Sequence, residues 1–310
     1  MLFTAENILL VGSILLFVSI VVGKTGYRFG VPALLLFLVV GMAFGSDGLG
    51  FQFHSAQTAQ FIGMVALSII LFSGGMDTKF TEIRPILTPG IVLSTVGVLL
   101  TALFTGLFIW WISGMSWSNI YLPLTTSLLL ASTMSSTDSA SVFAILRSQK
   151  MNLKYSLRPM LELESGSNDP CSYMLTVIIL TIMSGELSGS SLVVMIFSQI
   201  IFGILVGVVV ALAAAFILKK VNFATDGFDT IFVFSMALVS YAGASMINGN
   251  GYLAAYIAGI ILGNTPLHHK KSLVHFFDGI TGLMQMLIFF LLGLLAYPSQ
   301  LPKILPIALA

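Results

Sequence analysis

The stretch MLELESGSNDPCSYML, residues 160–175, concentrates side chains that could bind a small cation or a proton. Glu162, Glu164 and Asp169 supply carboxylates, and serine hydroxyls and an asparagine amide lie between them. Hard cations prefer such oxygen ligands, whereas soft metals prefer thiolate or imidazole. We therefore expect this stretch to hold a hard monovalent cation or a proton.

A second acidic residue, Asp138, lies in the polar segment ASTMSSTDSAS, residues 131–141. Serine and threonine side chains compete for backbone hydrogen bonds and can loosen a helix. Inside a membrane, irregular backbone is tolerated only where it lines a cavity or is buried in protein. The segment predicts a broken helix close to Asp138.

The first stretch has its own irregularity. Pro170 has no N–H, so the carbonyl one turn earlier loses its usual helical partner. Glu164 and Asn168 share one helical face by their i, i+4 spacing, and Ser165 and Asp169 share another. The spacing predicts two polar faces on one helix.

The elements that position these residues are membrane spans. Of 310 residues, 57% are hydrophobic and 8% charged, far below the roughly 25% charged of soluble domains. Apolar runs of crossing length, about 20 residues, predict an all-α polytopic membrane protein, because an open sheet leaves backbone groups unsatisfied in lipid. The expected spans are 5–23, 31–46, 57–75, 87–112, 121–146, 160–184, 191–218, 230–247, 250–265 and 275–297, with an eleventh starting near 300.

Basic residues alternate regularly between the predicted loops. Twelve of the 13 lysines and arginines follow odd-numbered spans, and Lys303 is the exception. The positive-inside rule makes the odd loops cytoplasmic and the N-terminus external. The net charge of +1 favours no nucleic-acid partner.

The two acidic positions lie at one predicted depth. Asp138 precedes Arg147 by nine residues, and Asp169 follows Arg158 by eleven. Both carboxylates then lie about 13–17 Å from the cytoplasmic boundary, near the middle of a core about 30 Å thick. Ionisable groups there cost several kcal/mol and indicate function. The alternative is a buried acid that only holds helices together.

The remaining polar residues suggest little further chemistry. Glu162 is expected to be solvated or interfacial near the cytoplasmic boundary, and Cys171 has no second cysteine for a disulfide. The four histidines lie in predicted loops or helix ends, so an intramembrane hydrolase would lack its base. No cofactor is expected. Internal helix crossings, rather than a dimer seam, are predicted at the glycine pairs 41/45, 203/207 and 259/263.

Five motifs resemble one transporter family. They are LELESGSNDP (161–170), SSTDSASVF (135–143), FSGGMDT (72–78), FDGITGLMQ (277–285) and LAAYIAGIILGN (253–264). Together they resemble the NhaP branch of the monovalent cation:proton antiporter-1 family, and most of all the CvrA-like potassium/proton antiporters. The resemblance implies thirteen spans in two inverted repeats with broken helices, an external N-terminus and a homodimer.

The resemblance also implies roles for individual residues. Asp169 would carry either the cation or the proton, with Asn168 beside it. Thr137 and Asp138 would form the unwound part of the fifth helix, and Ser165 would be a cation ligand. Glu164 would be an organising acid, paired with an arginine of the family that lies beyond position 310. The expected cation and proton site is Asp169, Asp138, Thr137 and Ser165, supported by Asn168 and Glu164.

The resulting expectation is a secondary antiporter in a bacterial inner membrane. It would exchange H⁺ for K⁺ or Na⁺ by alternating access, electroneutrally. We expect residues 1–310 to form one exchanger domain, with about ten complete spans and the start of an eleventh. The second repeat would be truncated, because the C-terminal part of the family domain is absent. The alternatives are a truncated, non-transporting fragment or a passive cation channel.

Overall fold

The computed structural model describes residues 12–14, 16–18, 20–21, 33–51, 53, 55–116, 118, 120–138, 142, 153–154, 157–185, 189–221, 227–267 and 270–309. Every regular element in these ranges is a helix, as the composition predicts. Five helical stretches there are long and apolar enough to cross a membrane.

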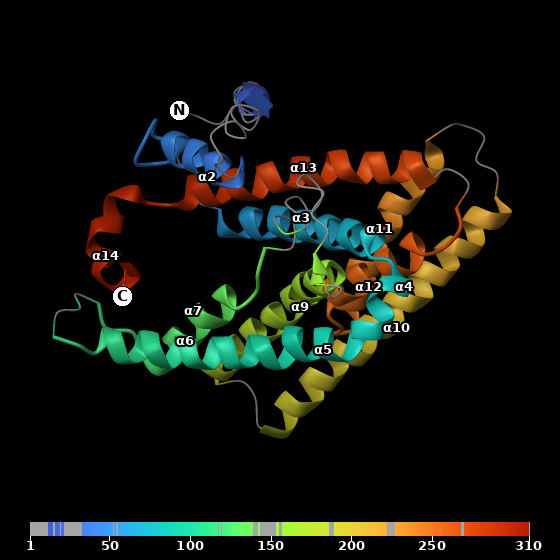
Figure 1. The fold of residues 1–310 in the computed structure, drawn as a ribbon. Helices are drawn as coiled ribbons and strands as arrows, with labels where there is room; N and C mark the ends of the chain where they lie inside the picture. The colour runs from blue at the N-terminus through green and yellow to red at the C-terminus, as the bar shows by residue number, and fades with distance from the viewer. Residues whose placement is uncertain are drawn as a thin grey trace. The chain divides into compact units, whose positions relative to one another are not determined.

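The helices follow one another along the chain as coloured in Figure 1. They are α2 (Ala33–Phe44), α3 (Ala56–Asp77), α4 (Phe80–Ile83), η1 (Arg84–Ile86), α5 (Leu87–Val92), η2 (Leu93–Gly97), α6 (Val98–Ser113), α7 (Leu124–Met134), α9 (Leu157–Ser184), α10 (Gly189–Lys220), α11 (Phe228–Met246), α12 (Gly251–Gly263), α13 (Lys270–Leu295), η4 (Pro298–Gln300) and α14 (Leu301–Leu309).

Most of these helices agree closely with the apolar runs of the sequence. α3 covers the run 57–75, α9 covers 160–184 and α10 covers 191–218. The fourth run, 87–112, is a continuous helical stretch that includes one π-helical turn, η2. Most of the first run, 5–23, lies outside the described residues.

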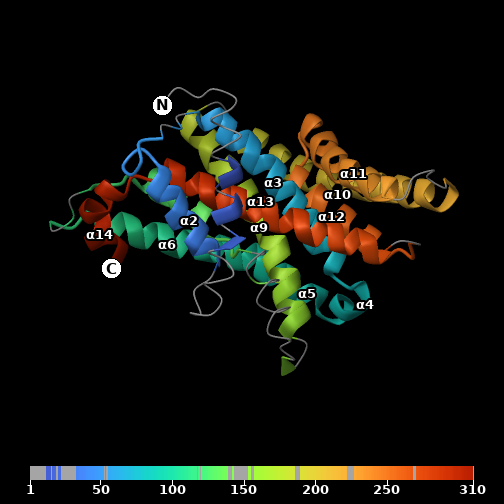
Figure 2. The ribbon, with the colours of Figure 1, turned by 90° about the horizontal axis from the view of Figure 1, so that it is seen from above.

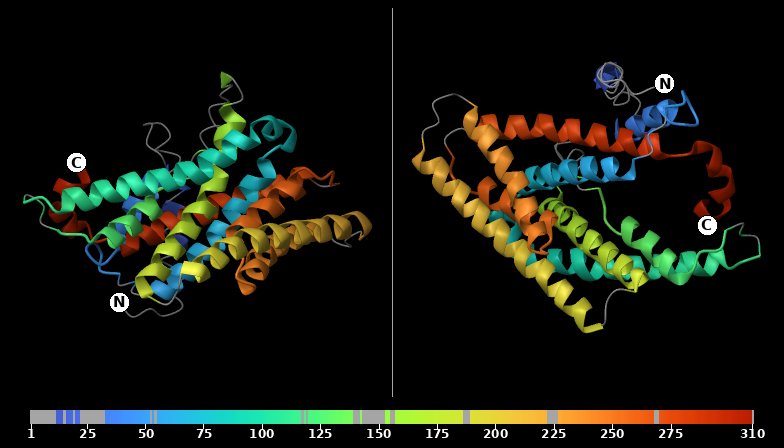
Figure 3. Two further views of the ribbon diagram at one scale, coloured as in Figure 1. Left: turned by 90° about the horizontal axis from the view of Figure 1, so that it is seen from below. Right: turned by 180° about the vertical axis from the view of Figure 1, so that it is seen from behind.

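The chain divides into two compact units, and residues 67–278 form the larger one. In it α10, α11 and α12 pack on one another (Figure 3). A Cβ atom on Gly207 would lie 2.6 Å from the Ala254 carbonyl oxygen of α12, and one on Gly203 would lie 2.9 Å from that of Asn250. Small residues therefore let α10 and α12 touch backbone to backbone.

Two further pairs in this unit cross closely. The Cα side of Gly259 in α12 faces the Phe72 backbone of α3, and α5 packs on α9 where Gly90 meets Leu163. α7 lies between α6 and α9. The order α6, α7, α9 presents the two polar segments of the sequence to each other.

The smaller unit contains residues 1–66 and 279–309. Here α2 packs on the second half of α13, where Gly41 meets Gly293 (Figure 2). The rings of Phe44 and Phe290 meet edge to face with centroids 6.4 Å apart. The prediction that the glycine pairs serve internal packing is thus confirmed at Gly41, as it is at the crossings of α10 and α12.

Contacts between loops agree with the alternating charge pattern. The backbone N–H of Phe80, after the third span, donates to Asn264 Oδ1, after the ninth, at 2.8 Å. The N–H of Ser299, after the tenth span, donates to Asp47, after the second, at 2.9 Å. A hydrogen bond from the side chain of Ser299 and, to a smaller extent, one from its backbone lower the pKa of Asp47. Loops that follow odd-numbered spans therefore contact one another here, and so do loops that follow even-numbered spans.

Candidate functional site: a polar crossing of α7 and α9

The helix that carries the polar segment 131–141 is broken where the sequence predicts. α7 ends at Met134, and residues 135–138 continue without helical structure. Among the described residues, the predicted span 121–146 therefore contains this short helix and, after the break, the helical residue Val142. Residues 139–141 and 143–152, with Arg147, lie outside them. Thr137 and Asp138 lie on the non-helical segment.

The polar segment 160–175 lies on α9, which continues through Pro170 without ending. The carbonyl of Pro170 accepts a hydrogen bond at 2.9 Å from the side-chain amide of Asn250, just before α12. Asn250 is 3% exposed, and its Oδ1 also caps α12 by accepting from the Leu253 N–H at 3.1 Å. The turn of α9 around Asp169 is thus held from a second helix.

Asn168 is the centre of the hydrogen-bond network between the two segments. Its side chain is 0% exposed, and its Nδ2 donates to Thr137 Oγ1 at 2.8 Å and to Glu164 Oε1 at 2.9 Å. The Thr137 hydroxyl donates in turn to Ser165 Oγ at 3.0 Å. Four of the six predicted site residues therefore form one cluster.

The two contacts of Asn168 also fix the orientation of its amide. A flipped amide would place its oxygen against the Glu164 carboxylate, where two acceptors would repel each other. The oxygen Oδ1 is buried and has no hydrogen-bond partner among the described residues. A buried amide oxygen without a donor suits a cation, since carbonyl oxygens are hard ligands.

A series of hydroxyl contacts sets the register of α7 on α9. Ser132 Oγ lies 3.1 Å from Thr176 Oγ1, and Ser172 Oγ donates to the Ser132 carbonyl at 2.5 Å. Thr137 then reaches Ser165, so the segments run antiparallel. This register brings Asp138 to the level of α9 at which the Asn168 cluster lies.

The two predicted carboxylates lie at the edge of this cluster. Asp169 follows Asn168 on α9 and is half-buried, whereas Asp138 follows Thr137 and is exposed. The Asp138 carbonyl accepts from the Val142 N–H at 3.1 Å. Both acids are one residue away from a member of the cluster, on separate segments.

Glu162 differs from the expectation of a solvated acid. It is 8% exposed, and its Oε1 accepts from Arg158 Nε at 3.0 Å. The i, i+4 spacing places the guanidinium above the carboxylate on α9, so the charge is neutralised within its own helix. The sequence did not predict this burial, because the loop-based depth takes no account of neighbouring helices.

Three residues of this region were not identified from the sequence. Ser172 bonds α9 to α7, Asn250 bonds α12 to α9, and the Tyr256 ring covers Gly166. A Cβ on Gly166 would lie 2.7 Å from the Tyr256 ring, so only glycine fits there. The glycine between two acids in ESGSND, residues 164–169, was a usable sign of close helix contact. Asn250 gave no such sign beyond its place before an apolar run.

The arrangement offers only oxygen ligands at the crossing. The hydroxyls of Thr137 and Ser165 and the amide oxygen of Asn168 lie at the crossing, and Asp138 and Asp169 each adjoin one of these residues in the sequence. Within the described residues no three His, Cys, Asp or Glu side chains come together as a metal site. Such a set can bind a monovalent cation or a proton at a carboxylate.

Comparison with known proteins points to transporters. The family profile described as "Sodium/hydrogen exchanger, transmembrane" matches residues 12–310. The chain is 36% identical over 303 residues to a K(+)/H(+) antiporter NhaP2 of Shewanella sp. strain MR-4, covering 96% of this chain and 50% of that protein. It is 38% identical over 298 residues to a K(+)/H(+) antiporter NhaP of Alkalimonas amylolytica, covering 95% and 50%.

The fold has a counterpart among solved structures. The sodium proton antiporter MjNhaP1 of Methanocaldococcus jannaschii superposes with a TM-score of 0.77 at 22% identity, covering 96% of this chain and 72% of that one. The chain spans about half the length of the curated relatives it matches. The likeness in structure shows the antiporter fold.

Proposed function

This chain belongs to the sodium/hydrogen exchanger family, and we propose that it exchanges protons for K⁺ or Na⁺ across a bacterial inner membrane. The observation that carries the proposal is the Asn168 cluster, which joins an unwound segment to a continuous helix beside Asp169. The proposed carrier is Asp169, with Asp138, Thr137 and Ser165 as cation ligands. Asn168 and Glu164 hold them in place.

The mechanism depends on competition for one carboxylate. A carboxylate in a membrane is costly when ionised and unpaired, so Asp169 holds either a proton or a cation. Asn168 engages one oxygen of Glu164, which keeps that acid in a supporting role. Raising the pH removes the proton from Asp169 and favours the cation.

Several further properties belong to the same proposal. The loop charges favour an external N-terminus and cytoplasmic odd loops. The family resemblance supports a homodimer and a transporter rather than an enzyme. Alternating access moves the loaded carboxylate between the two sides, as expected for inverted-repeat transporters.

The test is proton flux in vesicles that contain the protein and a pH-sensitive dye inside. Addition of K⁺ or Na⁺ outside is expected to drive protons outward from an acidic interior, without an imposed membrane potential. Cation flux driven by voltage alone, with no proton movement, would show a passive channel instead. Absence of both fluxes in protein that is folded and inserted would refute transport by this chain.

A further inference from the structure

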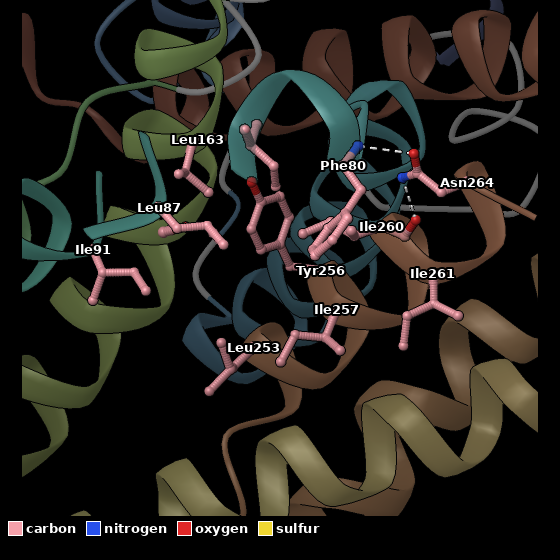
Figure 4. A pocket seen from close by; sticks show the side chains of 12 residues that line it. Phe80, Leu87, Ile91, Leu163, Leu253, Tyr256, Ile257, Ile260, Ile261 and Asn264 are labelled. Atoms are coloured by element: carbon pink, nitrogen blue, oxygen red, sulfur yellow. Dashed lines mark hydrogen bonds between the residues drawn. The ribbon is translucent and has the colours of Figure 1, made fainter. Parts of the chain in front are cut away.

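A cavity of about 520 Å³ lies within the larger unit, between the start of the α4–α5 stretch, α9 and α12. We call it the α12 cavity, and its lining includes Phe80, Leu87, Leu163, Leu253, Ile257 and Asn264. Figure 4 shows Leu87 and Leu163 on one side and Leu253 and Ile257 on the other. This volume falls within the range of about 300–1,000 Å³ typical of ligand sites.

The lining is almost wholly apolar. Its polar side chains are Ser167, Tyr256 and Asn264, and none of the lining residues carries a charge at neutral pH. The polar cluster on α9 uses Ser165 and Asn168, whereas Leu163 and Ser167 face the α12 cavity. An apolar cavity is a poor path for a hydrated ion and a good one for a hydrocarbon chain.

The depth of the α12 cavity matches one leaflet of a bilayer. One stripe of α12 lines it at i, i+4, i+7 and i+11, from Leu253 to Asn264. Eleven residues of helix rise about 16 Å, close to half of a hydrocarbon core about 30 Å thick. Its polar end is Asn264, which bonds the Phe80 N–H at the level of the odd loops.

Exposed apolar side chains border the α12 cavity along α5. Ile91, which lines it, is 51% exposed, and Phe80 at its polar end is 48% exposed. The next residues of the same helical stretch include Leu93 and Val96, which are 49% and 46% exposed. This stretch is apolar and of crossing length, so its exposed face suits contact with acyl chains.

The two chain segments that reach the polar end of the α12 cavity, at Phe80 and Asn264, are rich in basic residues. Arg84 is exposed directly after Ile83 of the lining, and Lys271 is exposed beside Lys270, whose ammonium bonds the Gly263 carbonyl. Glu82 is already paired with Lys79 at 2.7 Å. We call the described residues of 77–84 and 264–271 the rim; four of them are basic, Lys79, Arg84, Lys270 and Lys271, and two are acidic, Asp77 and Glu82.

We infer that the α12 cavity binds one acyl chain of an anionic phospholipid, whose phosphate contacts Arg84 and Lys271. Basic pockets between transmembrane helices on the cytoplasmic side are known to recognise anionic headgroups. The acyl chain of such a lipid matches the apolar cavity and its depth of one leaflet, and the anionic phosphate matches the basic rim. The inference does not depend on transport by Asp169.

The experiment uses the protein in lipid nanodiscs with phosphatidylglycerol or phosphatidylcholine carrying a diazirine in one acyl chain. After irradiation, labelled peptides are identified by mass spectrometry. Phosphatidylglycerol is expected to label residues 253–261 several-fold more than phosphatidylcholine does. Equal labelling by the two lipids, or labelling that is no stronger here than on α6, overturns the inference.

Two variants with matched controls separate the headgroup from the acyl chain. Arg84→Gln should lower the preference for phosphatidylglycerol about fivefold, as expected for one basic group near the surface, while Lys219→Gln on α10 leaves it unchanged. Ile257→Trp should fill the cavity and reduce labelling by both lipids, while Leu99→Trp on the exposed face of α6 does not.

Folding is checked by thermal melting of each variant. Because Arg84 is exposed, its variant stays informative even if Ile257→Trp fails to fold. A preference for phosphatidylglycerol that survives Arg84→Gln unchanged overturns the role of the basic rim, and with it the anionic ligand.

Discussion

The side-chain nitrogen of Asn168 lies 2.8 Å from Thr137 Oγ1 and so joins the middle of α9 to the non-helical segment after α7. The same nitrogen lies 2.9 Å from Glu164 Oε1. One amide group therefore holds a backbone break and an acid in fixed positions next to Asp169. Its removal should disturb both at once.

Asn168→Ala is expected to weaken apparent cation affinity about tenfold or more. Hydrogen bonds to charged groups contribute about 1.5–3 kcal/mol, and this change also leaves Thr137 without its donor. The measurement is the KM for K⁺ or Na⁺ in vesicles. Ser167→Ala is the matched control, since Ser167 adjoins Asn168 but faces the α12 cavity; equal effects of the two variants would contradict the role of the cluster.

Asp169→Asn should abolish exchange while the protein remains folded in the membrane. An amide at this position can neither release a proton nor neutralise a cation. Cation-driven proton flux in vesicles measures the loss, and Asp47→Asn, in an even loop, serves as control. Substantial flux through the Asp169 variant would remove this residue from the proposed role.

Asp138→Asn is expected to weaken cation binding and shift the pH profile of transport to lower pH. Loss of a neighbouring negative charge eases release of the proton from Asp169, and the cation loses one attractive group. The profile is measured as exchange rate against pH at several cation concentrations. If apparent affinity and pH profile both match wild type, Asp138 has only a structural role.

Exchange should be electroneutral, with one proton for each monovalent cation. Asn168 cannot titrate, so Asp169 is left as the single carrier of the Asn–Asp pair, and the loaded site is neutral with either substrate. Moving one net charge through 100 mV would involve about 2.3 kcal/mol. The check is transport in vesicles clamped at several potentials; a rate or final gradient that follows the potential would indicate a second titrating group, such as Glu164.

Asn250→Ala should destabilise the fold by about 1–3 kcal/mol, since it removes a helix cap and a buried hydrogen bond. The lost contacts are those to the Leu253 N–H and the Pro170 carbonyl. Asn250→Ser separates them, because serine can cap α12 but is too short to reach Pro170. Of the wild type and the two variants, Asn250→Ala should have the lowest melting temperature. If its melting temperature equals that of the wild type, the contacts of Asn250 do not stabilise the fold.

Local patterns in the sequence predict the helices and much of the site. The run of serines and threonines before Asp138 predicted the break after Met134, and the i, i+4 spacing predicted the contact of Glu164 with Asn168. These inferences needed only neighbours along one segment. The unforeseen burial of Glu162 and the unforeseen contact of Asn250 have another origin, because each depends on which helix packs beside α9. Periodicity identifies a face of a helix but not its partner.

The length of α12 has a consequence for the biogenesis of the protein. Its 13 residues extend about 20 Å, too short to cross a hydrocarbon core of about 30 Å alone. We therefore expect the connection from α11 to bend within the bilayer. In this connection Asn248 has a φ of 60°, and the Asn250 N–H donates to the Gln199 carbonyl of α10 at 2.9 Å. A translocon that releases helices one at a time would leave this bend unpaired in lipid, so we expect α11 and α12 to leave it together, as a hairpin that packs on α10 already in place.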